Sequence, residues 1–374
     1  MSFSIGVVLF ILAVEIVVIV HESGHFFFAK AFGMKVQEFF VGFGPRLWSV
    51  RRGDTEYGIK AIPAGGYVRI AGMNPFQEEP PEDLPRTFGA KPVWQRFVVI
   101  LAGPVTHFLM AFLLLAIYFS AVGAPSDSRA RVASVQSQLN GGPSPATAAG
   151  LRRGDVIEAV DGRPIRSLDQ VVAYTRAHVG QPIRLAVDRG GRVITLVVTP
   201  VLSNVDGQQV GRLGVSLEPG RQRAGPFVAV GRAGITTARL TGETVRSLGQ
   251  VFGPAGLDRI GRLLAGSTPR RPSDVGSVVS GARLAGQAVQ SGNWDFFFGI
   301  LIILNVFVGL VNLIPLPPLD GGHLAALAYE KIRRRRPDIR KLVPLTTVVA
   351  VFLILFSLSL IYIDITNPIP NPFR

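Results

Sequence analysis

His21-Glu22-Ser23-Gly24-His25 follows directly on an apolar run over residues 3–20. The five residues read H-E-x-x-H, and histidines four positions apart lie on one face of a helix, where they can bind a single metal ion. Glu22 stands beside them, where a carboxylate can accept a proton from a water that the metal activates. The same residues would also suit a solvated helix end. We favour the metal site, because ionisable groups at the edge of a membrane helix seldom occur without a function.

The composition indicates a membrane protein that also has soluble or irregular parts. Of the 374 residues 48% are apolar, yet 42 are Gly and 27 are Pro, which membrane spans plus a soluble insert explain. The net charge of +14 favours loops that face anionic lipid, so membrane lipid is an expected partner. No alternation of aromatic and basic residues supports a nucleic acid partner. Because Cys is absent, disulfides, thiolate metal sites and a Cys nucleophile are excluded, and His and carboxylate side chains must hold any metal.

Four apolar stretches are long enough, or nearly so, to cross a bilayer as helices. They cover residues 3–20 (extended by the metal motif), 97–122, about 296–314 and 343–363. The first lacks the basic flank and the small-residue cleavage site of a signal peptide, so we expect it to remain as a span. Glu15 interrupts it, and we interpret this residue as a buried polar group that faces other helices or a cavity, rather than as a catalytic group.

The basic residues of short loops predict the orientation. Residues 331–341, between the third and fourth spans, include seven basic residues and one acidic residue, so we expect this loop in the cytoplasm. The segment 26–96, with ten basic and seven acidic residues, is cytoplasmic by alternation. We expect a multi-pass protein of the plasma or inner membrane. Both termini and the segment 123–295 then lie on its extracytoplasmic side. The first span runs inward, which places H-E-x-x-H near the cytoplasmic side.

The segment after the first span predicts a β-hairpin near the metal motif. Residues 57–62 and 67–71 resemble strands that flank Pro63-Ala64-Gly65-Gly66, and Val41-Gly42-Phe43-Gly44-Pro45 resembles a turn. An exposed edge strand near such a site can pair with an extended substrate, although an ordinary cytosolic hairpin fits these residues equally well. The tentative substrate-binding residues of this hairpin are Gly65, Gly66 and Tyr67. The acidic, Pro-rich residues 75–92 read as a linker.

The extracytoplasmic segment predicts a small α+β domain followed by a helical connector. Gly150-Leu151-Arg152-Arg153-Gly154-Asp155 is similar to an element that is frequent in PDZ domains of the bacterial type. Such domains accept an extended chain beside an edge strand, and we expect a peptide-binding or gating role; the alternative is a β-rich domain that only blocks access. The predicted strands of this domain cover 130–135, 156–160, 183–187 and 193–198, its helix covers 167–178, and connector helices cover 228–252 and 275–289.

The third span ends in Asn312-Leu313-Ile314-Pro315-Leu316-Pro317-Pro318-Leu319-Asp320. A helix cannot run through this density of Pro, so the span breaks and a side chain can turn inward. Asp320 follows the break on the cytoplasmic side, which is also the side of His21 and His25. Two His and one carboxylate are the three protein ligands of a catalytic zinc site that keeps a position open for water, with Glu22 as general base.

Two further residues lie near this predicted centre. The amide of Asn312 could hold a substrate carbonyl or a developing oxyanion, and a helix cap or an inter-helix hydrogen bond is the alternative. His323 is a possible ligand, but two His and one Asp already suffice, so we interpret it as a supporting or structural residue.

The two motifs together resemble the site-2 protease family of intramembrane zinc metalloproteases. The match covers H-E-x-x-H in the first span and N-x-x-P-x-P-x-L-D-G from Asn312. It is closer still to the bacterial branch that acts in regulated intramembrane proteolysis, with four spans and a PDZ insert. The resemblance implies that His21, His25 and Asp320 bind zinc, that Glu22 is the catalytic acid/base, and that Asn312 and the hairpin assist substrate binding.

The resemblance also implies the class of substrate. These are single-span transmembrane proteins already shortened by a first protease, such as anti-sigma factors, or remnant signal peptides. Their cleavage releases a cytoplasmic fragment that changes transcription. The sequence itself carries no indication of an oligomeric state.

Two departures from the family pattern stand out. His107 ends the stretch Ala102-Gly103-Pro104-Val105-Thr106-His107, where the family commonly has Asn; it could keep a hydrogen-bonding role or tune the site. The chain has one PDZ-like domain where some relatives have two, which puts in doubt the size-exclusion mechanism proposed for the two-domain members.

The expected fold class is an α-helical membrane protein with four transmembrane helices, a cytoplasmic-side β-hairpin and an inserted extracytoplasmic PDZ-like α+β domain. A non-enzymatic PDZ scaffold and a metal transporter are the alternatives in function. Glu22 argues against both, because neither needs a general base, and a transporter would favour repeated halves. The predicted segments are 1–30 (first span), 31–96 (β-loop and linker), 97–122 (second span), 123–205 (PDZ-like domain), 206–295 (connector), 296–330 (third span with L-D-G) and 331–374 (basic loop and fourth span).

Overall fold

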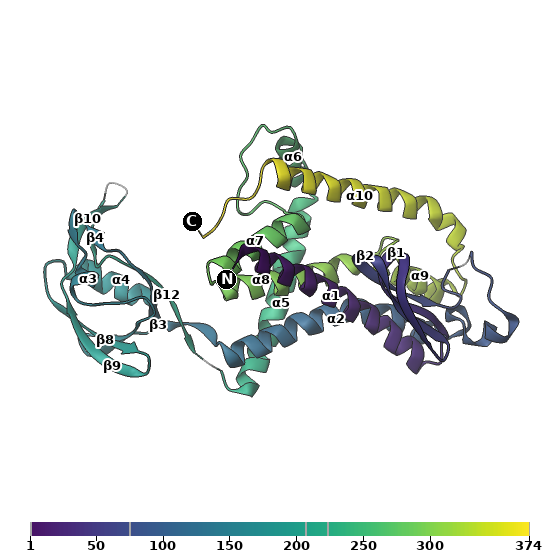
Figure 1. Ribbon diagram of the computed structural model, residues 1–374, viewed down its shortest axis with the longest axis horizontal. Helices are drawn as coiled ribbons and strands as arrows, with labels where there is room; N and C mark the ends of the chain where they lie inside the picture. Colours follow the sequence, from purple (N-terminus) through teal and green to yellow (C-terminus); the bar gives the residue numbers. More distant parts are fainter. Residues whose placement is uncertain (1, 75, 206–207, 223, 374) are drawn as a thin grey trace. The chain divides into compact units, whose positions relative to one another are not determined.

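The computed structural model describes residues 2–74, 76–205, 208–222 and 224–373, and Figure 1 shows its helices and strands. The chain forms two compact units. One comprises Met1–Leu115 and Ala233–Arg374, and the other comprises Ala116–Arg232. We name them the membrane unit and the inserted unit and describe each by itself.

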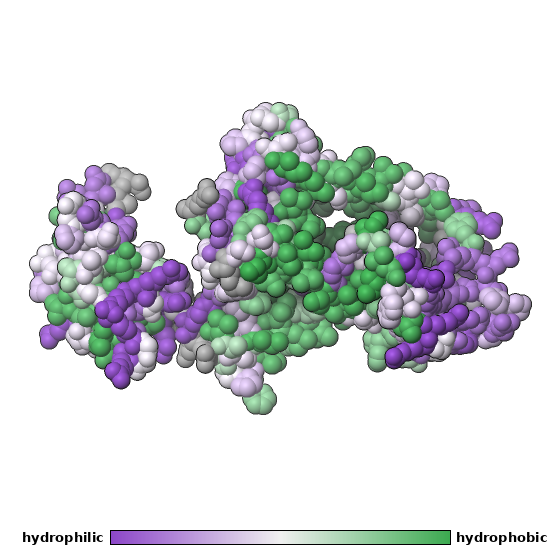
Figure 2. All heavy atoms as spheres, viewed as in Figure 1, coloured by the Kyte–Doolittle hydropathy of each residue, from purple (hydrophilic) through white to green (hydrophobic). Residues whose placement is uncertain are grey.

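Four helices in the described part of the chain are long and apolar enough to cross a membrane. All four predicted spans are therefore present as helices, and the first runs on through the metal motif. The face in Figure 2 shows apolar residues over much of these helices, and side chains such as Val8 and Leu12, both 54% exposed, suit contact with lipid. The helices are α1 (Phe3–Ala31), α2 (Val93–Ala121), α8 (Trp294–Asn312) and α10 (Val343–Thr366).

Small residues bring the connector against the first span. A Cβ added to Gly6 of α1 would lie 2.7 Å from the carbonyl oxygen of Ala285 in α7 (Val278–Gln290). Backbones that approach this closely pack through van der Waals contact, as apolar helices in membranes do. Phe10 is buried beside this contact together with Ala288. Both predicted connector helices are present, as α7 and as α5 (Pro226–Val251), and α6 (Pro254–Leu264) lies between them.

The predicted break after the third span separates two helices. α8 ends at Asn312, and α9 (Asp320–Arg333) begins eight residues later. Gly321 and Gly322 lie against the backbone of the Pro-rich turn, since a Cβ on Gly321 would lie 2.2 Å from the carbonyl oxygen of Ile314. Only residues without a side chain fit at the second and third positions of a helix this close to the turn, and this contact fixes Asp320 at the first position of α9.

A buried ion pair joins α9 to α2. The guanidinium of Arg96 donates to both carboxylate oxygens of Glu330, at 2.9 and 2.7 Å, and the two side chains are 7% and 14% exposed. A bidentate pair with little access to water has a defined geometry. It therefore fixes the rotation of α9, and with it the direction of Asp320, relative to α2.

A β-hairpin is present next to the first span, but it is not the one predicted, because the predicted strands 57–62 and 67–71 belong to a single strand and pair with the strand before it rather than with each other. The strands are β1 (Val36–Arg52) and β2 (Thr55–Ile70), and the turn is Gly53-Asp54. Residues 38–41 pair with 56–59 and also with 66–69, so the first half of β1 lies between two parts of β2. The residues 63–66 predicted as a turn carry β2 from one side of β1 to the other, and Pro63 is tolerated in such an irregular stretch because it need not donate to the ladder.

The predicted turn at residues 41–45 is likewise a bend inside β1. Its pairing shifts register between Val41 and Phe43 and again before Arg46. Gly42 and Gly44 have φ values of +86° and +83°, which glycine adopts without the steric penalty of a side chain. The glycines predicted a change of direction correctly, but the change is a bulge rather than a chain reversal. The linker predicted over 75–92 includes two short 3-10 helices, η1 (Pro81–Arg86) and η2 (Phe88–Ala90).

The inserted unit is a six-stranded sheet with one covering helix. Its strand order is β12-β3-β6-β8-β9, and β7 pairs with β6. The core includes Val132, Ile157, Leu185 and Val171, all fully buried. The elements are β3 (Ala124–Val135), β6 (Val156–Val160), β7 (Arg163–Pro164), β8 (Ile183–Arg189), β9 (Arg192–Val198), β12 (Val215–Gln222) and α4 (Leu168–Ala177), with short α3 (Pro145–Ala148) and the pairs β4 (Gln138–Leu139) with β5 (Gly142–Pro143) and β10 (Val201–Val205) with β11 (Gln208–Arg212).

The strands and helix predicted for the PDZ-like domain are present, but the sheet extends beyond its predicted end at residue 205. β12 lies in the segment assigned to a helical connector, yet it pairs with β3 at the edge of the sheet. Its sequence contains Pro219 and Gly220 and only two large apolar residues, so its pattern did not predict a strand. A cavity of about 290 Å³ lies beside this edge, between α4 and residues 210–217.

Candidate metal centre

The two histidines of the motif project from α1 toward a single point. Their Nε2 atoms lie 3.2 Å apart, as expected for positions i and i+4 of a helix. α2 lies directly against them, because a Cβ on Gly103 would be 2.2 Å from Nε2 of His25. A Cβ on Gly24 would be 2.8 Å from the carbonyl oxygen of Ala102. Glycine on both helices therefore allows α2 to cover the imidazole rings.

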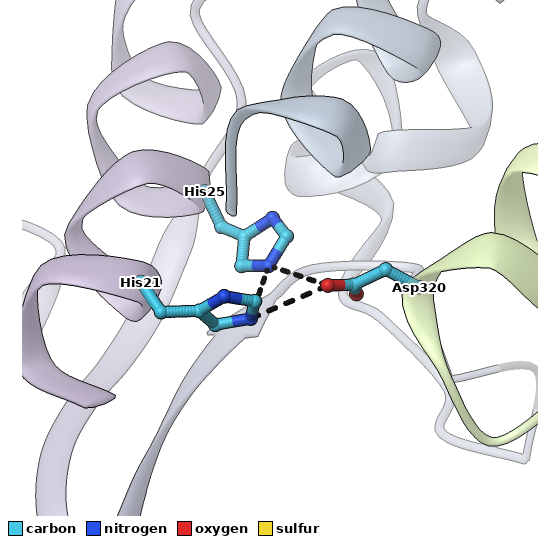
Figure 3. A group of neighbouring side chains, drawn as sticks. All are labelled: His21, His25 and Asp320. Atoms are coloured by element: carbon cyan, nitrogen blue, oxygen red, sulfur yellow. Dashed lines mark hydrogen bonds and ion pairs between the residues drawn. The ribbon is translucent and has the colours of Figure 1, made fainter. Parts of the chain in front are cut away.

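Asp320 completes a compact group of three side chains. Its Oδ2 atom lies 3.3 Å from Nε2 of His21 and 3.4 Å from Nε2 of His25, and Figure 3 shows the three side chains converging. This is the only group of three or more His, Cys, Asp or Glu side chains with metal-binding spacing in the described part of the chain. The structure thus brings together residues about three hundred positions apart in the sequence.

The geometry of this group fits a zinc ion. Ligands about 2.0–2.1 Å from zinc in a tetrahedral arrangement lie about 3.3 Å from one another, and the three observed separations are 3.2–3.4 Å. Oδ2 of Asp320 is buried and has no hydrogen-bond partner among the described residues. A buried carboxylate oxygen without a partner costs free energy, and a cation between the three atoms would remove that cost.

The ring of His25 is also oriented for a metal. Its Nδ1–H donates to the carbonyl oxygen of Val99 at 2.8 Å, which leaves the lone pair on Nε2. Histidine ligands of metals almost always donate their other ring N–H in this way. The sequence did not predict a role for Val99 or Gly103, because the contribution of α2 depends on how two distant helices pack. The one local signal was Ala102-Gly103, a pair of small residues within an apolar helix.

Glu22 lies between the three-residue group and the β1–β2 sheet. It shares the helix turn of His21, and a Cβ on Gly66 would be 3.7 Å from its Cγ. β2 therefore passes within van der Waals reach of this side chain at Gly66. Tyr67 stacks on Phe40 and donates from its hydroxyl to Glu38 at 2.5 Å, and Gly65 adopts a φ of +123°. Gly65, Gly66 and Tyr67 are thus on the strand segment nearest Glu22.

The other residues singled out in the sequence lie around the centre but outside the group of three. Asn312 is the last residue of α8, and its side chain has no hydrogen bond among those described. His323 lies one turn after Asp320 and lines a cavity of about 280 Å³ together with β2. Glu15 has one carboxylate oxygen buried without a hydrogen-bond partner among the described residues. His107 is 1% exposed, and its ring centroid is 4.9 Å from that of His21.

Comparison with known proteins yields one family over most of the chain. The model of peptidase family M50 matches residues 9–356. The chain is 36% identical to "Zinc metalloprotease Rip1" of Mycobacterium tuberculosis over 99% of each chain. It is 33% identical to "Metalloprotease MmpA" of Caulobacter vibrioides over 89% of this chain and 88% of the relative.

A solved structure matches a smaller part of the chain. It is the PDZ domain of an SdrC-like protein from Listeria monocytogenes. The match covers 25% of this chain and 90% of the solved domain, at 21% identity and a TM-score of 0.21. The family itself follows from the full-length matches. With a family model matched over residues 9–356 and relatives matched from end to end, the chain belongs to peptidase family M50, the site-2 protease family that its two motifs resemble.

Proposed function

We propose that this protein is an intramembrane zinc endopeptidase that cleaves the transmembrane segments of single-span proteins. The observation that carries the proposal is the meeting of His21, His25 and Asp320 at 3.2–3.4 Å, with Glu22 in the same helix turn. Both histidines belong to an apolar helix long enough to cross a membrane. A substrate must therefore present its peptide bond at membrane depth. Names of relatives such as "Zinc metalloprotease Rip1" support zinc as the metal.

The residues divide the chemistry between them. His21, His25 and Asp320 would hold zinc, which when bound acts as a Lewis acid and lowers the pKa of water. Glu22 accepts the proton of the attacking water and then delivers it to the leaving amine nitrogen. The side-chain amide of Asn312 donates to the substrate carbonyl or to the oxyanion that develops from it.

This function is tested by reconstitution of the full chain with a short single-span substrate in lipid vesicles. We expect one cut within the apolar segment of the substrate, loss of cleavage after zinc is removed with a chelator, and recovery when zinc is returned. A vesicle preparation without the protein is the control for spontaneous cleavage. Cleavage that persists at an undiminished rate after complete removal of the metal would contradict the proposal.

The edge of β2 is the part of the sheet that we propose binds substrate. Residues 66–70 pair with residues 36–41, and residues 67–70 also border the 280 Å³ cavity that His323 lines. An extended peptide can add to such an edge through backbone hydrogen bonds. In this position it would lie close to Glu22, because a Cβ on Gly66 would be 3.7 Å from Cγ of that side chain. An extended substrate also exposes its peptide bonds, whereas a helix keeps them hydrogen-bonded.

We expect a photoreactive residue in place of Tyr67 to crosslink to the substrate. The matched control is Leu47 in the second half of β1, a strand residue whose exposed fraction is 69%. Crosslinking is run in a Glu22→Gln background, so that substrate stays bound, and the adducts are measured by mass spectrometry. The expected yield at Tyr67 is several times that at Leu47. Equal yields at the two positions would remove residues 66–70 from the substrate site.

We propose that the metal centre lies toward the cytoplasmic side and that the inserted unit and both termini are extracytoplasmic. The proposal follows from the basic loop over residues 331–341. Because the chain has no Cys, single cysteines can be introduced and labelled with a membrane-impermeant thiol reagent in intact cells. A cysteine at Arg335 is expected to stay unlabelled and one at Arg192 to react. The opposite pattern would invert the assigned topology.

The proposed substrates are anti-sigma factors shortened by a first protease and remnant signal peptides. The resemblance of the two motifs to the bacterial branch of the family supports this class. Substrates of this kind are captured by the Glu22→Gln protein in cells and identified by mass spectrometry. Recovery of only multi-span proteins would contradict this assignment.

A further inference from the structure

A second polar pair lies next to the metal centre and is not used by the proposed mechanism. His107 of α2 and Asn305 of α8 are 1% and 0% exposed. The two helices meet closely here, since a Cβ on Gly309 of α8 would be 3.0 Å from Cβ of His107. Buried polar side chains are costly unless they have partners, so the pair calls for a physical explanation.

Asn305 determines which nitrogen of His107 carries the hydrogen. The amide nitrogen of Asn305 donates to the carbonyl oxygen of Leu301 at 2.9 Å, which leaves its Oδ1 atom to accept. Oδ1 faces Nδ1 of His107 at 3.4 Å, a long hydrogen bond. Nδ1 of His107 therefore carries the hydrogen and Nε2 has a free lone pair. That Nε2 atom is buried and has no partner among the described residues.

His21 has a ring N–H that lacks a hydrogen-bond acceptor. Its Nε2 atom faces Asp320, and a ring that binds metal through Nε2 has a hydrogen on Nδ1 to donate. The corresponding Nδ1–H of His25 is satisfied by Val99 at 2.8 Å. Nδ1 of His21 is buried without a hydrogen-bond partner among the described residues. Its ring edge faces α2, because a Cβ on Gly103, one turn before His107, would be 2.8 Å from Cε1 of His21.

We propose that His107 is a positioning residue for the metal centre and that its Nε2 accepts a hydrogen bond from Nδ1–H of His21. The ring centroids of the two residues are 4.9 Å apart and their planes are tilted by 35°, so the two rings are neighbours at a separation that suits a bond between ring nitrogens. One bond would satisfy two buried atoms, each of which costs free energy when it is left unpaired. A chain from Asn305 through His107 then orients His21. This inference rests on the proposed zinc site.

Zinc affinity of the purified full chain, measured by competition with a chromophoric chelator, tests the proposal. His107→Leu removes the acceptor and is expected to weaken zinc binding about ten- to a hundredfold, the usual effect of losing a partner of a metal-binding histidine. His107→Gln offers a side-chain oxygen in its place, and we expect affinity within about threefold of wild type. Val105→Ile, at an exposed position (47%) of α2 two residues before His107, is the matched control and is expected to match wild type.

Two further variants keep the test decisive. Asn305→Leu leaves His107 free to take either tautomer and is expected to weaken zinc binding by a smaller factor. In a His107→Leu background it should add no further loss, since coupled residues act as a unit. Folding of His107→Leu is checked by thermal unfolding of the metal-free protein. If it does not fold, the zinc affinities of Asn305→Leu and His107→Gln test the proposal, which expects weaker binding in the first and affinity near that of wild type in the second.

The outcomes separate this inference from the function on which it rests. Wild type that binds no zinc would contradict the proposed function itself. If His21→Ala loses zinc but His107→Leu binds it as tightly as wild type, only the positioning role is wrong. Equal loss in His107→Leu and His107→Gln would also overturn it, because then the size of the imidazole, and not its acceptor atom, is what the site requires.

Discussion

Replacement of Glu22 by Gln is expected to abolish cleavage while the protein keeps its zinc. The substitution preserves the size and shape of the side chain but removes the carboxylate that accepts the proton of the attacking water. A general base contributes about 10²–10⁴ to the rate of such reactions, so we expect a loss in kcat of about a thousandfold. Zinc should remain bound, because Glu22 is outside the group formed by His21, His25 and Asp320.

The measurement is the initial rate of cleavage of a reconstituted single-span substrate, together with the zinc content of each preparation. Glu15→Gln is the matched control. It makes the same chemical change in the same helix, seven residues or about 10 Å along the axis from Glu22. We expect its rate to stay within a few-fold of wild type. Equal rates for wild type and Glu22→Gln would exclude the assigned mechanism, whereas loss of zinc from Glu22→Gln would move Glu22 into the ligand set.

This experiment also distinguishes an enzyme from a membrane scaffold or a metal transporter. A scaffold that recruits partners through the inserted unit, or a transporter that binds metal through the same ligands, has no requirement for a general base. In either case Glu22→Gln would bind metal and partner proteins as wild type does, and no cleavage would be present to lose. The assignment of this protein as an enzyme therefore depends on the carboxylate of Glu22. Glu22→Gln tests it by replacing one carboxylate oxygen with an amide nitrogen.

The sequence predicted which side chains of the metal centre come together, because the membrane spans determine where those side chains lie. The length of the apolar runs predicted four spans, and the basic loop over residues 331–341 predicted which ends face the same side. Together the spans and the basic loop predict that His21, His25 and Asp320 lie near one another, and the structure brings these three side chains together. A bilayer restricts the chain to a few arrangements, which is why a local motif and a charge pattern were sufficient.

The sequence did not predict features that depend on packing between distant elements. The role of Gly103 follows from the approach of α2 to the histidine rings, and no local pattern encodes that approach. The turn of the hairpin was placed at residues 63–66, because Pro and Gly usually mark reversals. Here those residues carry β2 around β1, and tertiary pairing overrides the local signal. β12 was missed for a similar reason, since its pairing with β3 compensates for a weak strand pattern.

Removal of the carboxylate of Asp320 is expected to cost the protein its zinc. Asp320→Ala leaves two histidines, and zinc bound by two protein ligands is held far more weakly than zinc bound by three. Loss of a residue that only supports a ligand costs about 10–100-fold in affinity, so loss of a ligand itself should cost at least a hundredfold. Cleavage should fall to the background rate for the same reason.

The position of Asp320 makes this prediction sharper than one drawn from the motif alone. Gly321 and Gly322 fix the start of α9 against the Pro-rich turn, and the pair of Arg96 and Glu330 fixes its rotation. The side chain therefore cannot be replaced by a neighbour that swings into its place. His323, one turn along α9, is the residue best situated to try, and His323→Ala is the matched control.

Zinc content and chelator competition of the two variants decide the ligand set. We expect His323→Ala to bind zinc as wild type does, because His323 is outside the group of three atoms that lie 3.2–3.4 Å apart. Unchanged zinc content in Asp320→Ala would remove Asp320 from the site, and loss of zinc from His323→Ala alone would put His323 in its place. Asp320→Asn keeps an oxygen at the same position without the negative charge. An intermediate affinity for that variant would show that both the position and the charge of the third ligand stabilise the metal.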